Sequence, residues 1–565
     1  MLAKNSRLIA STFIITVLIC FFATIAIKIN FFLNYFINID SAFYVKWFSD
    51  LSLTNRIFPN SENSFYKNLL IDKDSFLHQL LRRYYNNSSE IYTIVPTTIN
   101  YLLMSSIGAG FKTFNLGSIL ANSIIPIICS FYFFKKYKLN NLKIIILIIF
   151  IFLIFLTNFN FFYLSPLGIH NYSLLSLVIS FLIIDAYYKE KNFFNYKIIF
   201  LGILIPCFTH KFNVPLIFMT LFFVIIYRKS YSNNFKNEFF YLFTLFILII
   251  LPLIIGFYIN PKNLAFLSSF FTDNDYSNLA QKNLFYSLLN YELKTIKHGI
   301  SKLFSNYYYS LNLIGIILLI LSLFKINNLI LKLFLVSNIL LFIFLPVSPY
   351  SLRIFNYQLI IILIILIEYF VKNIFSNNKF PNLIILIIFV SFISISSYKT
   401  FFKKNLDENA NELIKVYYKG NQELKDFLFS INKKNQINPS NIIFGNYAAK
   451  DLFYSYFYEY NKNQKIDAFP VILSLYNNRN NNNYLKSLNI DFNKLYSTYY
   501  FNILLKDKNK VIDPTLDKLC EIRKKNYNNC GDIKKVELFI DKTTINEVFY
   551  NGHAYTLFFY KIEPK

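Results

Sequence analysis

The sequence predicts an all-α polytopic membrane domain of about 11 transmembrane helices, followed by a small α/β domain. Hydrophobic residues make up 55% of the 565-residue chain and charged residues 16%, whereas an ordinary soluble domain is about half apolar and about a quarter charged. Apolar runs such as KIIILIIFIFLIFL at 143–156 are, with their flanks, long enough to cross a bilayer. Past about Ser397 the chain becomes polar and rich in asparagine. This composition excludes a soluble enzyme, a disordered chain and a small disulfide scaffold.

Eleven apolar segments are each expected to form a membrane helix, although several of them are short. They lie near residues 8–28, 115–134, 144–163, 170–187, 197–209, 212–227, 239–259, 309–324, 328–345, 357–371 and 380–397. The further apolar segment 91–107 carries Pro96, three threonines and Asn100. We expect this segment to form an external surface helix or a re-entrant helix rather than a span.

The distribution of Lys and Arg predicts the orientation, because cytoplasmic connectors carry an excess of these residues. Lys4 and Arg7 place the N-terminus in the cytoplasm. Further basic residues stand in every second connector, near 135–143, 189–197, 228–236, 325 and 372–379. An odd number of spans then places the C-terminus outside. The predicted parts are a membrane domain at 1–397, with external loops at about 29–114 and 260–308, and an external soluble domain at 398–565.

The 398–565 tail is expected to be a small mixed α/β domain. An amphipathic helix is predicted at 411–431 and strands at 441–444, 536–540, 547–550 and 555–562. The last two strands flank Asn551-Gly552, which is a strong signal for a two-residue hairpin. Cys520 and Cys530 lie in this exported tail, where an oxidising compartment favours a disulfide between them.

The net charge of +26 is compatible with either nucleic acid or a membrane as partner. Much of the basic excess lies in the connectors assigned to the cytoplasm, and the sequence carries no nucleic-acid-binding motif. We therefore expect membrane lipid, and no nucleic acid, as a partner. No cofactor and no metal site is predicted, although a requirement for a divalent metal stays open.

Asp40 is the first candidate for chemistry. It follows the first predicted span and precedes a segment in which Tyr44, Trp47 and other aromatic side chains share one helical face. Such a helix is expected to lie in the membrane interface. Two interpretations of Asp40 remain open: a plain helix N-cap, or a carboxylate that faces a cavity and acts as a general base.

Basic residues at the predicted outer face form a second group of candidates. His210 and Lys211 interrupt an apolar run that suits two short spans with an outer turn, and Arg353 stands between two later spans. His170 opens a span in the sequence SPLGIHNY. A guanidinium suits bidentate phosphate binding, so this group fits a bound anion. The alternatives are snorkelling to the interface and contacts with lipid headgroups.

The external loops hold a third group. In the 260–308 loop, Asp273, Asp275 and Tyr276 form an acidic patch, and in the first loop Arg82 and Arg83 stand side by side. Loops of this length often act as lids or binding loops. The alternative for the acidic patch is a solvated turn, and the alternative for the arginine pair is a stripe of side chains that faces lipid headgroups.

Asp40, Lys211 and Arg353 all map to the outer face under this topology. One carboxylate and several cations at that level suit a reaction whose leaving group is a lipid-linked phosphate. The carboxylate would deprotonate an acceptor hydroxyl, and the cations would stabilise charge on the departing phosphate.

Four stretches of the sequence together resemble one known superfamily. They are DSAFY after the first span, IVPTTINYLLMSSIGAGFKTFN with its Gly-aromatic turn, CFTHKFNVPLI with its basic turn, and YSLRIFNYQLIIILII with its late arginine. This pattern, over roughly residues 1–400, resembles the GT-C membrane glycosyltransferases, in particular bacterial relatives of protein O-mannosyltransferases and aminoarabinose transferases. Many members carry two acidic residues together where this chain has Asp40 and Ser41, and the WWD motif of oligosaccharyltransferases is absent.

The resemblance implies an integral membrane glycosyltransferase in the bacterial inner membrane. Asp40 would be the catalytic base, and Arg353 with Lys211 would contact the lipid phosphate, with His210, Tyr44 and His170 as further substrate-binding candidates. The donor would be a polyprenyl-phosphate-type sugar lipid, the acceptor a glycan, lipid or protein, and the external domain would lie in the periplasm.

Two other functions compete with this one. An O-antigen-type polymerase or ligase uses Arg and His on large external loops, which 29–114 and 260–308 would supply. A transporter or flippase would need no chemistry, but such proteins often show internal repeats, and the sequence shows no convincing repeat.

Overall fold

The structure is a computed structural model. It describes residues 2–33, 44–45, 47–49, 77, 80–81, 84–85, 88–137, 139–163, 168–229, 234–260, 300, 303, 307–308, 310, 311–344, 348–375, 379–402, 442–444, 453–454, 471–472, 499–505, 533–540 and 555–562. The chain divides into two compact units. The first comprises Met1–Leu33, Ile57–Ile99 and Leu116–Lys403, and the second comprises Asn34–Arg56, Asn100–Asn115 and Lys404–Lys565.

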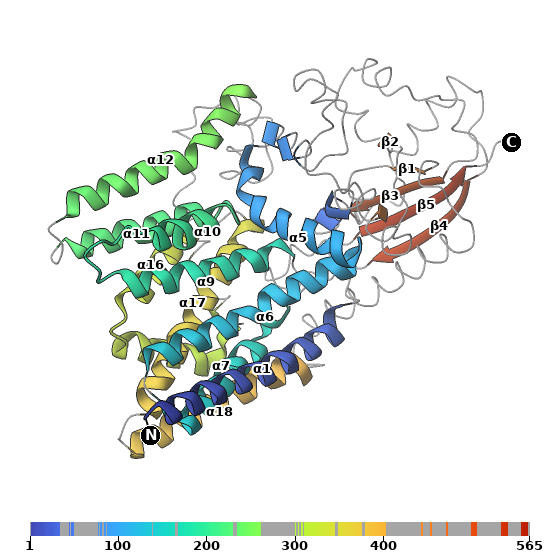
Figure 1. Ribbon diagram of the computed structural model, residues 1–565. Helices are drawn as coiled ribbons and strands as arrows, with labels where there is room; N and C mark the ends of the chain where they lie inside the picture. Colours follow the sequence, from blue (N-terminus) through green and yellow to red (C-terminus); the bar gives the residue numbers. More distant parts are fainter. Residues whose placement is uncertain are drawn as a thin grey trace. The chain divides into compact units, whose positions relative to one another are not determined.

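Helices dominate the first unit (Figure 1), and the segment Asn100–Asn115, which includes parts of two helices, belongs to the second unit. In chain order the helical elements are α1 (Leu2–Phe32), η1 (Ser88–Thr93), α5 (Ile94–Ile107), α6 (Phe111–Lys136), α7 (Asn141–Thr157), α8 (Phe159–Tyr163), α9 (Ile169–Tyr187), η2 (Ile198–Leu204), α10 (Ile205–Cys207), α11 (Asn213–Arg228), α12 (Phe235–Ile259), α16 (Leu329–Phe344), α17 (Ser348–Ile374), α18 (Lys379–Ser397) and η3 (Tyr398–Phe402). A further apolar helix covers Ser310–Lys325.

Each of the eleven apolar segments contains helix in the described part of the chain. Six helices are long and apolar enough to cross a membrane: Leu8–Phe32, Phe111–Lys136, Ile169–Tyr187, Phe235–Ile259, Phe355–Ile374 and Asn382–Phe401. These six make the chain compatible with a multi-pass membrane protein. The other five apolar helices have 10–17 residues. Helix α5 has 14 residues, fewer than the roughly 20 that a straight span needs.

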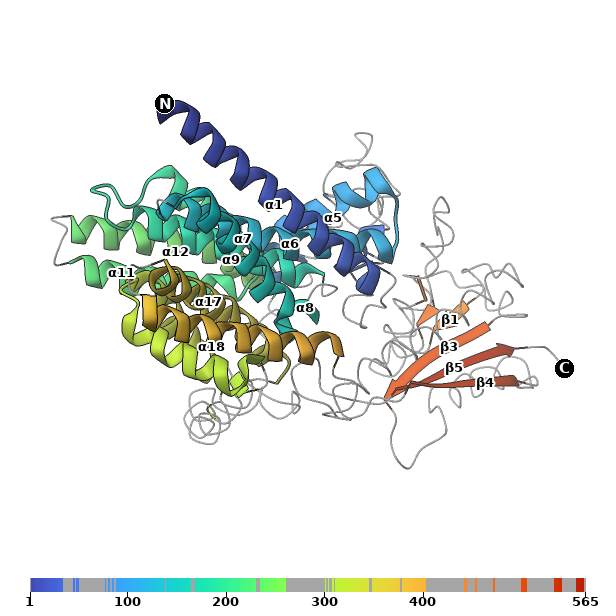
Figure 2. The ribbon, with the colours of Figure 1, turned by 90° about the horizontal axis from the view of Figure 1, so that it is seen from below.

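Helix α17 is the centre of the helical unit. Every residue from Phe355 to Val371 is buried, as expected for a helix that is apolar on all sides. It packs against α7, α9, α16 and α18, and Figure 2 shows α18 alongside it. By contrast α1 exposes large apolar side chains, such as Ile19 at 64% and Phe22 at 63%. Continuous exposed apolar surface of this kind suits contact with lipid.

The segment predicted as one helix at 144–163 is broken. Helix α7 ends at Thr157, and Asn158 takes an extended conformation with ψ 117° before α8 begins. The Asn158 side chain accepts a hydrogen bond from Phe161 N at 3.1 Å and donates one to Ser310 O at 3.2 Å. The prediction of one continuous helix was wrong because this asparagine caps a second helix, and hydropathy alone does not register a cap.

The second unit contains a five-stranded sheet in the order β2-β1-β3-β5-β4. The strands are β1 (Ile442–Phe444), β2 (Val471–Ile472), β3 (Tyr499–Leu505), β4 (Ile533–Ile540) and β5 (Tyr555–Ile562). Strand β1 pairs in parallel with β2 and β3, whereas β5 is antiparallel to β3 and β4 (Figure 1). The predicted strands at 441–444, 536–540 and 555–562 coincide with β1, β4 and β5. The predicted helix at 411–431 and the strand at 547–550 lie outside the described residues.

The two-residue hairpin predicted at Asn551-Gly552 would pair β5 with the strand predicted at 547–550, and this pairing was wrong. Tyr555 pairs with Ile540 of β4 on one side and with Leu505 of β3 on the other, so both edges of β5 are occupied along its length. Strand β3 was not among the predicted strands, and a local turn signal cannot report a strand pair that forms over a long separation.

Candidate functional site

The first turn of α9 is the meeting point of polar side chains in the helical unit. Gly168 precedes the helix with φ 50°, a left-handed conformation that glycine adopts at little cost. His170 and Ser173 are three residues apart and therefore share one side of α9, while Asn171 points elsewhere. The N-terminal end of a helix also carries partial positive charge. This turn is therefore suited to gather donors around an anion.

His210, Tyr357 and Ser173 form a hydrogen-bonded chain on one side of this turn. The Tyr357 hydroxyl lies 3.3 Å from His210 Nδ1 and 2.5 Å from Ser173 Oγ. Ser173 Oγ is also 3.1 Å from Asn213 Oδ1. His210, Ser173, Asn213 and Tyr357 are each at most 2% exposed. Because buried polar groups are costly without partners, this chain holds its members in defined positions.

The two predicted histidines meet at the same place. The rings of His170 and His210 lie 5.5 Å apart between centroids, with an interplanar angle of 65°. Lys211 follows His210 in the chain and places its Nζ 5.9 Å from the centroid of the Phe212 ring. The structure thus brings together two predicted residues that the sequence separates by 40 positions.

A buried lysine lies on the other side of the turn. Lys28 of α1 is 0% exposed and donates to Asn122 Oδ1 of α6. Asn122 Nδ2 donates to Asn171 Oδ1 at 2.8 Å, and Asn171 Nδ2 donates to Ser118 Oγ at 2.7 Å. The ammonium also lies 5.1 Å from the centroid of the Phe161 ring. No carboxylate of the described chain forms an ion pair with Lys28.

We name these groups the α9 cluster: Lys28, Ser118, Asn122, His170, Asn171, Ser173, His210, Asn213 and Tyr357. The contacts that join them, within the described residues, are hydrogen bonds between amides, hydroxyls, the His210 imidazole and one ammonium, and a ring contact that adds His170. Arg353 lies in α17, one helical turn before Tyr357. The α9 cluster thus combines one ammonium with neutral hydrogen-bonding groups near the N-terminal end of α9.

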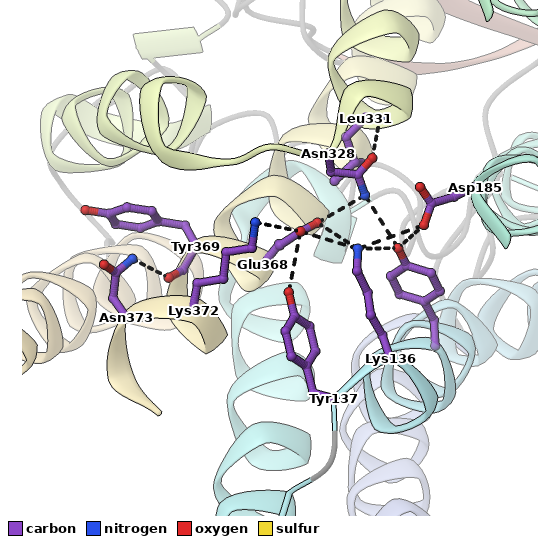
Figure 3. A network of polar contacts seen from close by, with 10 residues as sticks. Lys136, Tyr137, Asp185, Asn328, Leu331, Glu368, Tyr369, Lys372 and Asn373 are labelled. Atoms are coloured by element: carbon purple, nitrogen blue, oxygen red, sulfur yellow. Dashed lines mark hydrogen bonds and ion pairs between the residues drawn. The ribbon is translucent and has the colours of Figure 1, made fainter. Parts of the chain in front are cut away.

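The opposite ends of α9 and α17 carry a different set of polar groups (Figure 3). Glu368 of α17 is 1% exposed and accepts from Lys136 at 3.3 Å, from Asn328 at 3.2 Å and from Tyr137 at 3.5 Å. Lys372 lies 3.4 Å from the same carboxylate. Tyr132 donates to Asp185, and Lys136 donates to Tyr132 at 2.8 Å. We name this set the Lys136–Glu368 network: Tyr132, Lys136, Tyr137, Asp185, Asn328, Glu368 and Lys372.

The Lys136–Glu368 network balances its charges. It holds two carboxylates and two ammonium groups, contributed by α6, α9 and α17. Burial and the neighbouring Glu368 carboxylate raise the pKa of the Tyr137 phenol, which therefore stays neutral and donates. A second buried ion pair, Arg228 with Glu238 at 2.9 Å, joins α11 to α12. Paired groups of this kind brace helices and leave no net charge for a ligand.

Several predicted site residues lie outside what the structure describes. They are Asp40, Arg82, Arg83, Asp273, Asp275, Tyr276, Cys520 and Cys530. Tyr44 is described, in the second unit, where its half-buried ring lies 5.9 Å from that of Phe48. Trp47 in the same stretch is 8% exposed, so it is buried in protein. We expected the aromatic face of this segment to lie in the membrane interface, but the Trp47 side chain on that face is buried, because an aromatic face can pack on protein as well as on lipid.

The residues predicted from the sequence do not include several members of the α9 cluster: Lys28, Asn122, Asn171, Ser173, Asn213 and Tyr357. A usable signal was present, because polar residues within membrane helices usually face the protein interior. Ser118 and Asn122 stand four apart and so share one face of α6. Lys28 was overlooked because it stands at the end of the first predicted span, where a basic residue has an ordinary explanation.

No protein-family model matches this sequence, and no curated protein shows significant similarity to it. In the part of the chain that the structure describes, no group of three or more His, Cys, Asp or Glu side chains is arranged to hold a metal ion.

Proposed function

We propose that the chain is an integral membrane glycosyltransferase of the GT-C type. It moves a sugar from a polyprenyl-phosphate-type lipid to a glycan, lipid or protein acceptor at the outer face of the membrane. The observation that supports this proposal is the α9 cluster, which surrounds a helix N-terminus with Lys28, His170 and His210. Such a set of donors suits a phosphate, since anions bind favourably at helix N-termini and next to cations.

The proposed reaction follows from the charges involved. The acceptor oxygen forms a bond to the anomeric carbon of the sugar while the bond from that carbon to the phosphate oxygen breaks. The hydroxyl proton passes to Asp40, and the electron pair leaves with the lipid phosphate. Asp40 acts as general base, while Lys211, Arg353 and the α9 cluster stabilise the negative charge on the leaving phosphate.

The proposal includes the full predicted topology. Eleven spans at 1–397 leave the N-terminus in the cytoplasm and an external α/β domain at 398–565, in the inner membrane of a bacterial cell. In support, the sheet strands all lie beyond residue 441, and the basic connectors alternate along the chain. Alkaline phosphatase fused after Ser397 should be active, and an inactive fusion would overturn this orientation.

A second candidate is an O-antigen-type polymerase or ligase, which the contact between His170 and His210 favours. Such an enzyme would take a glycan carried on a lipid diphosphate rather than a single sugar on a lipid monophosphate. The two candidates therefore differ in the donor that the α9 cluster would hold.

Donor turnover tests the proposal directly. We would reconstitute the full chain in lipid nanodiscs with a panel of polyprenyl monophosphate sugars and mixed glycan acceptors, and measure release of polyprenyl phosphate. Asp40→Asn should abolish release, while the exposed control Glu190→Gln should leave it unchanged. Full activity of Asp40→Asn would exclude this mechanism. Turnover of diphosphate-linked glycans alone would favour the polymerase or ligase.

A further inference from the structure

The connector between α9 and η2 carries more positive than negative charge. Residues 188–197 contain one acidic residue, Glu190, and three basic ones: Lys189, Lys191 and Lys197. Lys197 is half-buried, and the other three side chains are exposed. In the part of the chain that the structure describes, none of these side chains forms an ion pair. The charge of the lysines is therefore not neutralised by a described carboxylate in direct contact.

Lys197 has a hydroxyl and two aromatic rings as neighbours in place of a carboxylate. Its ammonium donates to the Tyr187 hydroxyl at 2.9 Å, and it lies 5.4 Å from the centroid of the Tyr187 ring and 5.7 Å from that of the Tyr196 ring. An ammonium carries three hydrogens, and a phenol that accepts a hydrogen bond still has its own hydrogen to donate. Lys197 and Tyr187 therefore form a pair of adjacent donors.

The connector is held against the helices by its buried residues. The Phe193 ring is 1% exposed and lies 4.8 Å from the guanidinium carbon of Arg228, which is itself held in a buried ion pair. The Asn195 side chain accepts hydrogen bonds from the backbone N–H groups of Lys197 and Ile198 at 3.0 Å and 3.1 Å. It thus satisfies two backbone donors at the start of η2, and these contacts fix the position of Lys197.

These donors lie where the apolar surface of the helices begins. Tyr187 is the last residue of α9, which is long and apolar enough to cross a membrane, and Lys197 directly precedes the apolar segment η2. Within η2, Phe200 is 57% exposed and Leu201 is 36% exposed. Basic and aromatic side chains next to exposed apolar ones are typical of the headgroup level of a membrane.

We propose that Lys197 and Tyr187 bind the phosphate of an anionic phospholipid, with Lys189 and Lys191 adding positive charge. A lipid suits this place because its headgroup meets the donors while its acyl chains cover the exposed apolar side chains of η2. Clusters of lysine at the end of a membrane helix favour anionic headgroups. Under the proposed orientation the site lies in the cytoplasmic leaflet, and it does not depend on the proposed reaction.

Lipid titration of the full chain tests the site. Native mass spectrometry in detergent with phosphatidylglycerol measures how tightly the first lipid binds. Lys197→Gln should weaken this binding about fivefold, and adding Lys189→Gln and Lys191→Gln should bring the loss to more than about tenfold. Thermal unfolding of these surface variants should match that of the unchanged protein.

Lys325→Gln is the matched control for charge. Lys325 is exposed and ends another apolar helix, Ser310–Lys325, so the variant loses the same charge at a similar place. It should weaken binding less than about twofold, because charges separated by more than a Debye length are screened. Equal effects of Lys197→Gln and Lys325→Gln would show attraction to the total charge alone, and would overturn the site.

Tyr187→Phe tests the hydroxyl donor. It keeps the ring and should weaken binding of phosphatidylglycerol about threefold. Tyr188→Phe is the control, since the Tyr188 ring lies 5.5 Å from the Lys189 ammonium and its hydroxyl is not part of the proposed site. Equal binding by both variants would remove Tyr187 from the site.

Other ligands distinguish a lipid from phosphate alone. Phosphatidylcholine, whose choline cation neutralises its phosphate, should bind at least about fivefold more weakly than phosphatidylglycerol. Glycerol phosphate, which lacks acyl chains, should compete poorly. Equal affinity for the two lipids, or strong competition by glycerol phosphate, would overturn the assignment of an anionic lipid. If the lipid affinities are as expected but no sugar donor is turned over, the proposed function alone fails.

Discussion

The two ends of α9 and α17 hold buried polar groups in different ways. On α17, Tyr357 and Glu368 are 11 residues apart, which is roughly 16 Å along a helix. The Lys136–Glu368 network pairs each carboxylate with ammonium and phenol donors. The α9 cluster contains an ammonium, two imidazoles in ring contact and several amides and hydroxyls, and Lys28 within it pairs with no described carboxylate. The first arrangement pairs its charges within the protein, whereas the second contains a cation that no described carboxylate pairs.

This contrast predicts that the same kind of substitution has opposite effects at the two ends. Removing a charge from the balanced network leaves its buried partners unsatisfied and destabilises the fold. Removing the buried cation from the α9 cluster relieves a desolvation cost and, under the proposed function, weakens binding of the donor phosphate. Stability and donor binding should therefore be measured on the same variants.

Glu368→Ala is expected to have the largest effect on stability. It removes the acceptor shared by Lys136, Lys372, Asn328 and Tyr137, and should destabilise the protein by about 2–4 kcal/mol. Thermal unfolding in detergent measures this change, with Glu190→Ala at an exposed site as the matched control. A loss no larger than that of the control would show that the network does not brace the helices.

Lys28→Met should lower affinity for polyprenyl monophosphate about tenfold or more while leaving the protein as stable as before or more stable. An apolar side chain of similar length removes the desolvation cost of an ammonium that has no described carboxylate partner, and this gain offsets the hydrogen bond that Asn122 loses. Lys136→Met, at the other end, should instead lower stability and leave affinity per folded molecule unchanged. Loss of stability in Lys28→Met without loss of affinity would show that Lys28 supports the fold rather than the ligand, and would contradict the proposed difference between the two ends of the helices.

Asn338→Leu should stabilise the protein by about 1–2 kcal/mol. Asn338 is 0% exposed, and among the described residues neither its side-chain nitrogen nor its side-chain oxygen has a hydrogen-bond partner. Asn171→Leu is the matched change at a hydrogen-bonded amide and should destabilise. The chemical-unfolding midpoints of the two variants should move in opposite directions. A shift in the same direction would contradict the idea that hydrogen-bond partners decide whether a buried amide stabilises the fold.

Lys372→Ala should have the smallest effect, less than about 1 kcal/mol. Its side chain is 34% exposed and lies one turn from Glu368 on the same helix, so solvent screens the pair and Lys136 still contacts the carboxylate. A loss as large as that of Glu368→Ala, measured by thermal unfolding, would mean that Lys372 carries more of the network than its exposure indicates.

Much of the helical layout was predictable because hydropathy and charge act locally. The predicted segments 170–187, 212–227 and 328–345 agree closely with α9, α11 and α16. His170, His210 and Arg353 were likewise identified one at a time, as polar residues at the ends of apolar runs. The break at Asn158 and the long-range pairing of β5 were not predictable in this way, because a cap and a strand partner depend on specific neighbours.

The sequence by itself determined which segments are helical, where their polar ends lie and which connectors between them carry the excess of lysine. The tertiary structure alone decided which polar groups meet: Lys28 with Asn122, Ser173 with Tyr357, and Tyr357 with His210, over separations of 94, 184 and 147 residues. The physical reason lies in α17. A helix buried on every side from Phe355 to Val371 has no polar face to indicate its rotation, so only packing places Tyr357 against α9 and Glu368 against Lys136.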